Sequence, residues 1–168
     1  DEKKAMESME LLRSINEKAA IITTSIEKLD GKKILEVMEH PVSLADELLK
    51  EEQEHHHDHD EECGCGHHHD HHHHHADEVF TSWGRETIKK FTREGLEKML
   101  ESLSASEEYG VILRAKGMLP AEDGTWIYFD MVPEETEIRE GSPEYTGRLC
   151  VIGSKLNEEK LAKLFGVA

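Results

Sequence analysis

Histidine and cysteine, the residues best suited to bind transition metals, are concentrated in one short stretch of this 168-residue sequence. Twelve of its 13 histidines lie between His55 and His75, and only His40 lies outside. Cys63-Gly64-Cys65 places two thiols one residue apart in the same stretch. Neutral imidazole binds Zn²⁺, Co²⁺ and Ni²⁺, and thiolate favours tetrahedral Zn²⁺. The candidate metal ligands are His55, His56, His57, His59, Cys63, Cys65, His67, His68, His69, His71, His72, His73, His74 and His75.

The His-rich stretch, residues 55–75, also carries acidic side chains that add oxygen ligands and a negative field attracting cations: Asp58, Asp60, Glu61, Glu62 and Asp70. A structural zinc finger has one defined pair of cysteines, one defined pair of histidines and a core, whereas this stretch has surplus ligands and no core. We therefore expect several exchangeable ions, each bound with modest affinity, because ordering the chain costs part of the ligation energy. Such binding suits capture and hand-over of metal ions.

Other interpretations of the same stretch stay open. An engineered purification tag is usually terminal and uninterrupted, whereas this stretch is internal and mixed with aspartate and cysteine. It also fits a solubilising spacer with incidental metal affinity. Cys63 and Cys65 fit a redox pair or spectator thiols, although redox sites more typically have two residues between the cysteines.

The charge of the chain is strongly negative and unevenly distributed. The net charge is −17, which makes nucleic acid and anionic membrane surfaces unfavourable partners. Residues 46–78 contain twelve acidic side chains and a single basic one, Lys50. Residues 53–76 contain no large apolar side chain. Nothing there offsets the entropy cost of ordering the backbone, about 1–2 kcal/mol per residue, so residues 53–76 are predicted to be a disordered linker.

Neither a secretory signal peptide nor a run of about 20 apolar residues, as needed to span a bilayer, is present in the sequence. Three cysteines do not make a disulfide framework and suit a reducing compartment. We therefore expect a cytoplasmic protein.

The N-terminal residues predict a helix, a strand and a helix. Apolar residues at helical spacing predict an amphipathic helix over residues 3–15, and Ala19–Thr24 is predicted to be a short buried strand. A second helix should follow Asp30-Gly31, and a third should begin near Ser43. A lone strand has no sheet to join, and the chain opens on Asp1. We therefore expect residues 1–40 to be the C-terminal fragment of a larger α/β domain.

Residues 77–168 predict a self-contained α+β domain with about four strands and helices on one face. Thr92 and Asn157 should each cap a helix, Gly166 should end the last helix, and Asp123-Gly124 signals a hairpin turn. The predicted strands are residues 79–83, 109–117, 125–130 and 148–153, with residues 135–139 as a weaker extension of the third beyond Pro133.

Several side chains of this domain have both a packing and a functional interpretation. Cys150 lies in an apolar strand and is expected to be a small buried side chain, and His40 is expected to end a helix. Arg114 and Lys116 share one face of a strand, which fits either a solvated face or a basic contact for a nucleotide or protein. The aromatic residues expected to pack in the core or on the sheet are Trp83, Trp126 and Tyr128.

Three segments of this domain together resemble the C-terminal domain of the CobW-type GTPase metallochaperones. They are Val111–Gly117, which ends in Arg-x-Lys-Gly, then Trp126, then Val151–Leu156, which contains Ile-Gly and precedes a capped helix. Upstream, Leu12–Asn16 followed by Ala19–Ser25 resembles the last helix, strand and helix of the family's GTPase domain. A histidine-rich insert between the two domains is also a family feature.

The resemblance implies three segments: 1–40 from a P-loop GTPase-like domain, 41–76 as an acidic metal-binding linker, and 77–168 as the CobW C-terminal-like domain. The phosphate-binding pattern G-x-x-x-x-G-K-[ST] and the family's Cys-x-Cys-Cys motif are both absent from the sequence. GTP and Mg²⁺ would therefore bind only in an upstream domain.

We accordingly expect no enzymatic activity from this chain. No Ser/His/Asp set lies on predicted elements, and no carboxylate pair lies in apolar surroundings. The expected function is binding and delivery of zinc, or of cobalt or nickel, to a client metalloprotein, as part of a GTP-dependent cobalamin-synthesis CobW-like protein. The C-terminal domain would contact the client or its own GTPase domain. The alternative is a protein-interaction domain with the linker as a spacer or metal store.

Overall fold

The computed structural model describes residues 2–39, 44, 48 and 80–167. Its centre is a five-stranded sheet in which all neighbouring strands are antiparallel. The strands are β1 (Thr81–Thr87), β2 (Val111–Pro120), β3 (Trp126–Val132), β4 (Glu135–Gly141) and β5 (Gly147–Ser154), in the spatial order β1-β5-β2-β3-β4.

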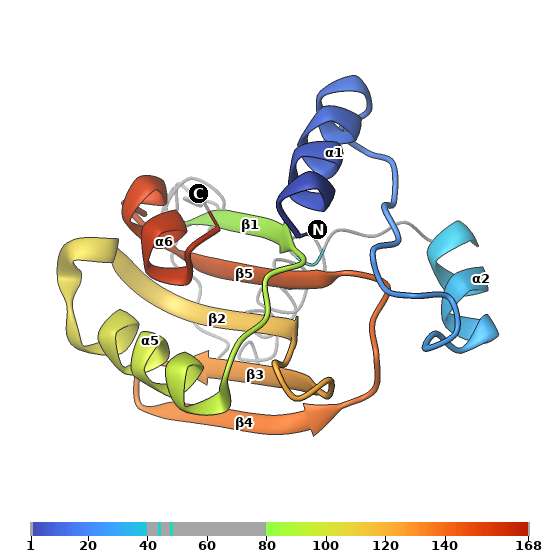
Figure 1. Ribbon diagram of the computed structural model, residues 1–168. Coiled ribbons are helices and arrows are strands. Elements are labelled where there is room, and N and C mark those ends of the chain that lie inside the picture. The colour runs from blue at the N-terminus through green and yellow to red at the C-terminus, as the bar shows by residue number, and fades with distance from the viewer. Residues whose placement is uncertain (1, 40–43, 45–47, 49–79, 168) are drawn as a thin grey trace, which may run out of the picture.

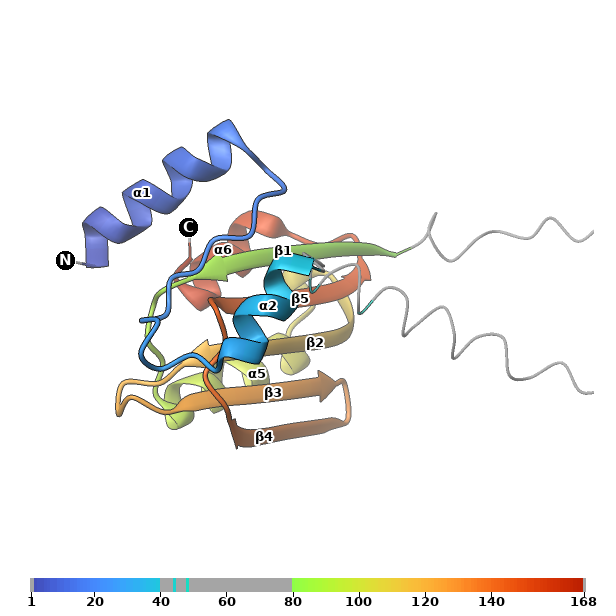
Figure 2. The same cartoon turned by 90° about the vertical axis from the view of Figure 1, so that its right-hand side faces the viewer.

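Two helices cover one face of the sheet, α5 (Arg93–Ala105) and α6 (Glu158–Phe165), and the short 3₁₀ turn η1 (Glu107–Tyr109) leads into β2 (Figure 1). Two further helices, α1 (Glu2–Ile15) and α2 (Gly31–Glu39), lie outside this layer near one end of β1 and β5. In the turned view of Figure 2 the strands lie one above another from β1 to β4, with α5 and α6 behind the sheet and α2 drawn in front of it. The predicted α+β class, with the helices of the C-terminal domain on one face, is confirmed.

The caps predicted from local sequence form as expected. Thr92 Oγ1 accepts a hydrogen bond from Gly95 N at 3.0 Å, and Asn157 Oδ1 accepts one from Lys160 N at 3.1 Å. Each satisfies a backbone donor that the first helical turn leaves unpaired. Gly166 ends α6 with φ of +64°, the left-handed conformation that glycine adopts at low cost.

The sheet is packed on both faces. On the helix-covered face, Leu96 and Leu100 of α5 and Phe165 of α6 pack against strand residues that include Phe129 and Val151. On the other face, a second cluster comprises Leu44, Leu48, Met118, Trp126, Cys150 and Ile152. Because β5 contributes to both clusters, Gly147–Gly153 are buried in succession, and the prediction that Cys150 is a buried side chain is confirmed.

The strand bounds differ from prediction at two sheet edges. Residues 135–141 form a separate fifth strand, β4, paired in antiparallel register with β3 rather than extending it. All but the half-buried Ile138 and Gly141 are exposed, so the alternation of apolar side chains that reveals a strand is nearly absent. The first strand begins at Thr81 and runs to Thr87, because pairing with Gly147–Gly153 of β5 sets its length rather than the apolar residues 79–83.

The predicted strand Ala19–Thr24 is wrong. No residue from 19 to 24 has strand conformation, and Ile22 is 41% exposed. The backbone amides of Thr23 and Thr24 both donate to the single carbonyl of Tyr145, at 2.8 and 3.0 Å. A strand needs a ladder of alternating donors and acceptors, and this segment has no parallel neighbour in the described part of the chain. The helices on either side, α1 and α2, are confirmed.

Candidate functional site

All fourteen predicted metal ligands, from His55 to His75, lie outside the residues that the structure describes, as does His40. Within residues 2–39, 44, 48 and 80–167, no three His, Cys, Asp or Glu side chains are grouped so that they could hold a metal ion. The candidate site therefore stays a prediction, and the structure shows how the chain is attached on either side of it.

Both sides of the His-rich stretch are attached to the same apolar cluster. Leu44 and Leu48 have helical backbone, as predicted for the third helix, and are 5% and 0% exposed against Met118, Trp126, Cys150 and Ile152. Phe80, which precedes β1, packs against the same cluster. Leu48 and Phe80, the described residues on either side of this stretch, thus both lie on the face of the sheet opposite α5 and α6.

The basic residues of β2 on this face have structural partners. Arg114 forms a two-bond pair with Asp130 of β3, with Nε to Oδ1 at 3.0 Å and Nη2 to Oδ2 at 2.7 Å. The Arg114 side chain is 16% exposed. A planar guanidinium matched to a carboxylate in this way fixes both side chains, and it accounts for Arg114 without a nucleotide or protein ligand.

The glycine that closes the Arg-x-Lys-Gly pattern is required by packing. A Cβ on Gly117 would overlap the ring of Phe129 and lie 2.9 Å from the carbonyl oxygen of Arg148. Phe129 is opposite Gly117 in the β2–β3 register and is 3% exposed. The aromatic ring therefore occupies the place that any larger residue at position 117 would need.

The aromatic residues pack as predicted. Trp83 is 2% exposed and stacks on Phe165 of α6 with ring centroids 6.1 Å apart. Trp126 is 5% exposed in the cluster with Leu44 and Leu48. Tyr128 is half-buried on the same face, and its hydroxyl donates a hydrogen bond at 2.9 Å either to Ser142 O or to Glu144 Oε1.

A buried carboxylate that the sequence did not reveal lies just before β5. Glu144 is 5% exposed and contacts Lys33 of α2 (Oε1 to Nζ, 3.1 Å), Arg148 (Oε2 to Nη2, 3.4 Å) and the Tyr128 hydroxyl. In the sequence, Glu144 follows Ser142-Pro143 and has the composition of an exposed loop. Its partners come from α2, β3 and β5, so no local spacing signals the cluster.

This polar cluster shifts the pKa values of its neighbours. Burial lowers the pKa of Lys33, but the hydrogen bonds and negative charges of Glu144 and Glu36 outweigh burial and raise it above its usual value. Burial, reinforced by the hydrogen bond to Glu144, raises the pKa of Tyr128 well above its usual value. Lys33 thus stays charged and Tyr128 neutral around Glu144 at physiological pH.

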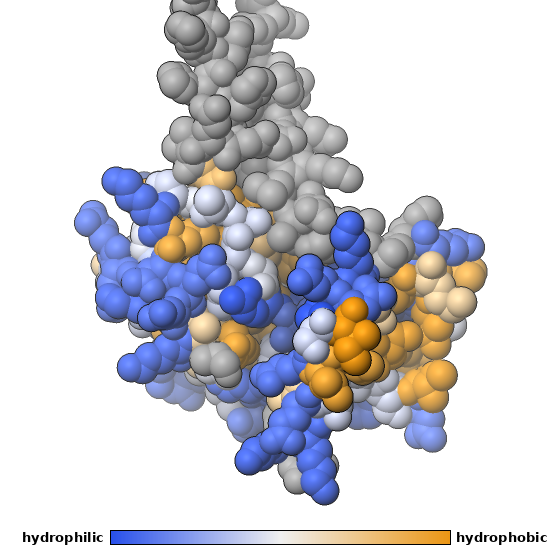
Figure 3. All heavy atoms as spheres, turned by 90° about the horizontal axis from the view of Figure 1, so that it is seen from above, coloured by the Kyte–Doolittle hydropathy of each residue, from blue (hydrophilic) through white to orange (hydrophobic). Residues whose placement is uncertain are grey.

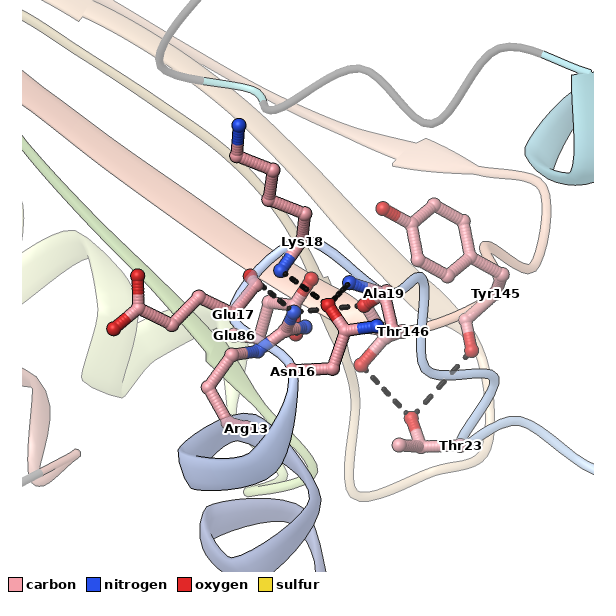
Figure 4. A network of polar contacts seen from close by, with 9 residues as sticks. All are labelled: Arg13, Asn16, Glu17, Lys18, Ala19, Thr23, Glu86, Tyr145 and Thr146. Atoms are coloured by element: carbon pink, nitrogen blue, oxygen red, sulfur yellow. Dashed lines mark hydrogen bonds and ion pairs between the residues drawn. The ribbon is translucent and has the colours of Figure 1, made fainter.

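A second polar group joins the end of α1 to the sheet. Arg13 forms an ion pair with Glu86 of β1 and also donates to the backbone oxygens of Glu17 and Ala19, at 2.6 and 2.7 Å (Figure 4). Nearby, Thr23 Oγ1 and Thr146 Oγ1 are 2.9 Å apart. These contacts bring the segment after α1 against the start of β5.

A match to one protein family covers residues 80–168, which include the whole sheet together with α5 and α6. The family is described as the cobalamin synthesis protein cobW C-terminal domain. The chain belongs to the cobW C-terminal family. The resemblance carried by Val111–Gly117, Trp126 and Val151–Leu156 is thereby confirmed, because all three lie inside the match.

Two solved structures resemble this cobW C-terminal chain in fold. The Zn(II)-bound YjiA GTPase from E. coli has 24% identity and a TM-score of 0.45, over 55% of this chain and 31% of that one. A Zn(II)-bound triple mutant of the YjiA GTPase has 22% identity and a TM-score of 0.46, over 53% and 29%. The chain thus spans less than a third of the length of either structure. No curated protein matches it.

Among the described helices, none has the length and apolar character needed to cross a membrane.

Proposed function

We propose that this chain binds and delivers transition-metal ions, with zinc as the preferred cargo and cobalt or nickel as alternatives. The observation that carries the proposal is the density of ligands: twelve histidines and two cysteines between His55 and His75. Membership of the cobW C-terminal family supports it. The folded domain would contact the recipient, a client metalloprotein or the GTPase domain of the same protein, while the ligand-rich stretch holds the cargo.

Attachment at both ends supports a role in capture. Leu48 and Phe80, which flank residues 49–79 in the sequence, contact one cluster on the same face of a folded domain. Ligands on such a segment stay near that domain and sample it at high effective concentration, because the distance between its ends is limited. A contact made by the domain with a client would therefore bring the cargo close to the client.

Competition with a chromophoric zinc chelator tests the proposal. We expect the chain to withdraw more than one Zn²⁺ per molecule at neutral pH, because the ligands exceed the four that one tetrahedral site needs. The matched control has the twelve histidines of residues 55–75 changed to asparagine, which keeps length and polarity. A stoichiometry below one ion per chain would reject metal binding as the function, and equal withdrawal by the control would reject the histidines as the ligands.

We also propose the domain arrangement in which residues 1–40 are the end of a P-loop GTPase-like α/β domain, 41–76 the metal-binding linker and 77–168 the cobW C-terminal domain. Exposed apolar side chains of the N-terminal helices and the turn between them support it: Ile15, Ile26 and Met38 are each about three-quarters exposed. Figure 3 shows hydrophobic atoms gathered toward the side where α1 and α2 lie. GTP and Mg²⁺ would act in that upstream domain, and the protein would be cytoplasmic.

The exposed apolar surface also favours a second candidate function, a protein-interaction domain in which the linker serves as a spacer. Leu11, Leu12 and Leu35 are each more than half exposed, which is typical of surfaces that contact another protein. Deleting residues 51–76 separates the two candidates. Unchanged growth under zinc limitation and unchanged partner binding would favour the spacer, whereas loss of growth would favour metal delivery.

A further inference from the structure

The segment Arg13–Val37 is held to the C-terminal domain mainly by polar contacts. Most of them converge on three consecutive residues at the entry to β5, Glu144, Tyr145 and Thr146. The carbonyl of Tyr145 accepts hydrogen bonds from the amides of Thr23 and Thr24. The carbonyl of Glu144 accepts one from Thr24 Oγ1 at 2.6 Å, and its carboxylate pairs with Lys33. The hydroxyl of Thr146 is hydrogen-bonded to that of Thr23. The ion pair of Arg13 with Glu86 adds a contact on β1.

The apolar part of this contact is small. Leu29 and Val37 are buried against Tyr145, with Ile34 partly buried beside them. The main core, by contrast, is built from residues between Trp83 and Val167, and the cluster on the opposite face is completed by Leu44 and Leu48. Neither core contains a residue of the segment Arg13–Val37, so the sheet and its two covering helices keep their packing without it.

Three isoleucines of the same segment are exposed. Ile15, Ile22 and Ile26 are 74%, 41% and 73% exposed, among exposed charged residues such as Glu17, Lys18 and Glu27. The segment is therefore joined to the domain mainly through polar groups, and these three isoleucines add little apolar burial to the contact. Ion pairs and hydrogen bonds at a partly exposed junction are weakened by salt and replaceable by water.

We infer that residues 13–37 form a detachable strap, which exists in an attached and a released state while the C-terminal domain stays folded in both. Attachment depends on the hydrogen bonds to Tyr145 O and Glu144 O and on the ion pair between Lys33 and Glu144. Release would free α1 and α2 from the entry of β5. This inference does not depend on metal binding, so its failure and the failure of the proposed metal delivery are distinguishable.

Amide hydrogen exchange of the full chain, followed residue by residue by NMR, tests the strap. The amides of Thr23 and Thr24 report on attachment directly, since both donate to Tyr145 O. In Glu144→Gln we expect these two amides to exchange about tenfold faster, corresponding to the loss of one hydrogen bond to a charged group. The amides of β2 and β5 should keep their protection. The matched control is Glu140→Gln, which removes the same charge from an exposed position of β4.

A second variant leaves the domain side intact, because Glu144 also contacts Tyr128 and Arg148 within the domain. In Thr23→Val combined with Thr24→Val, the hydroxyl contacts are lost from the strap alone, and we expect its remaining protected amides to exchange faster while the sheet is unchanged. Added sodium chloride should have the same effect in the wild-type chain. If strap and sheet lose protection together in these experiments, or if neither changes, the strap is part of one cooperative unit and the inference is overturned.

Discussion

At the scale of single residues, Arg114 and Gly117 belong to a motif that could indicate a ligand site, but each has a structural role inside the sheet. Both belong to the pattern Arg-x-Lys-Gly, which marks the family. Arg114 is engaged by Asp130 across the β2–β3 pair, and Gly117 leaves room for the ring of Phe129. A motif shared within a family can thus be explained by packing and pairing inside the sheet, so its presence alone does not indicate a ligand.

Replacing Gly117 tests the packing explanation. We expect Gly117→Ala to lower the free energy of unfolding by about 1–3 kcal/mol, because the added methyl overlaps the Phe129 ring and strands on both sides prevent relaxation. Gly31→Ala is the control, since a Cβ at position 31 meets nothing within 4 Å at the start of α2. It should be neutral or slightly stabilising. Urea denaturation measures both, and equal effects would contradict the explanation.

The three tyrosines of the chain provide a second test at this scale. Burial raises the pKa of Tyr109, Tyr128 and Tyr145 above the usual value of 10.0. Because the folded state then binds protons more tightly than the unfolded state, the stabilisation is present below pH 10 and is lost as pH rises above it. We expect the near-ultraviolet absorbance of tyrosinate to appear at higher pH in the native chain than in urea. Identical titration curves would show that the rings are solvated.

At the scale of secondary-structure elements, helix ends were set by local chemistry and strand ends by pairing. Thr92 and Asn157 each satisfy a backbone donor within their own first turn, so the residues on either side suffice to predict them. β4 has no comparable local signal. Its register is set by seven residue pairs with β3, and it lies at the edge of the sheet with one side open.

The Thr92 cap gives a prediction at this scale. Thr92→Ala should destabilise the chain by about 1 kcal/mol, because Gly95 N loses its acceptor, whereas Thr92→Ser keeps a hydroxyl and should recover most of the loss. The midpoints of thermal unfolding of the two variants and the wild type provide the comparison. A serine variant as unstable as the alanine variant would mean that the threonine methyl, and not the cap, is responsible.

At the scale of the whole molecule, a packed cobW C-terminal domain is joined to a stretch of predicted metal ligands, residues 55–75. Helices α5 and α6 pack on one face of the sheet, and Leu44 and Leu48 pack on the other. Within the described residues, both apolar clusters are built without histidine. Metal chemistry and folding should therefore respond to pH independently.

Acidification tests this separation. Imidazole has an ordinary pKa of about 6.5 and binds metal only when neutral. We expect zinc retained by the chain to fall steeply between neutral pH and pH of about 5, while far-ultraviolet circular dichroism of the domain stays constant. Equilibrium dialysis at each pH measures the retained zinc. Loss of secondary structure in parallel with zinc would show that the ions hold the fold together.

The sequence by itself determined the features that depend on neighbours along the chain. The strand at residues 125–130, the caps at Thr92 and Asn157 and the stop at Gly166 all follow from the physics of a few consecutive residues. The family and the α+β class followed from the order of such segments. The ligand-rich composition of residues 55–75 was equally plain.

Only the tertiary structure decided the features made by residues far apart in sequence. Glu144 is buried because α2, β3 and β5 each bring a partner to it, and residues 19–24 are not a strand because both amides at Thr23 and Thr24 meet one carbonyl 121 or more residues away. The physical reason is the same in each case. Burial and long-range hydrogen bonding depend on which segments come into contact in the folded chain. The residues next to a position in the sequence do not indicate those contacts.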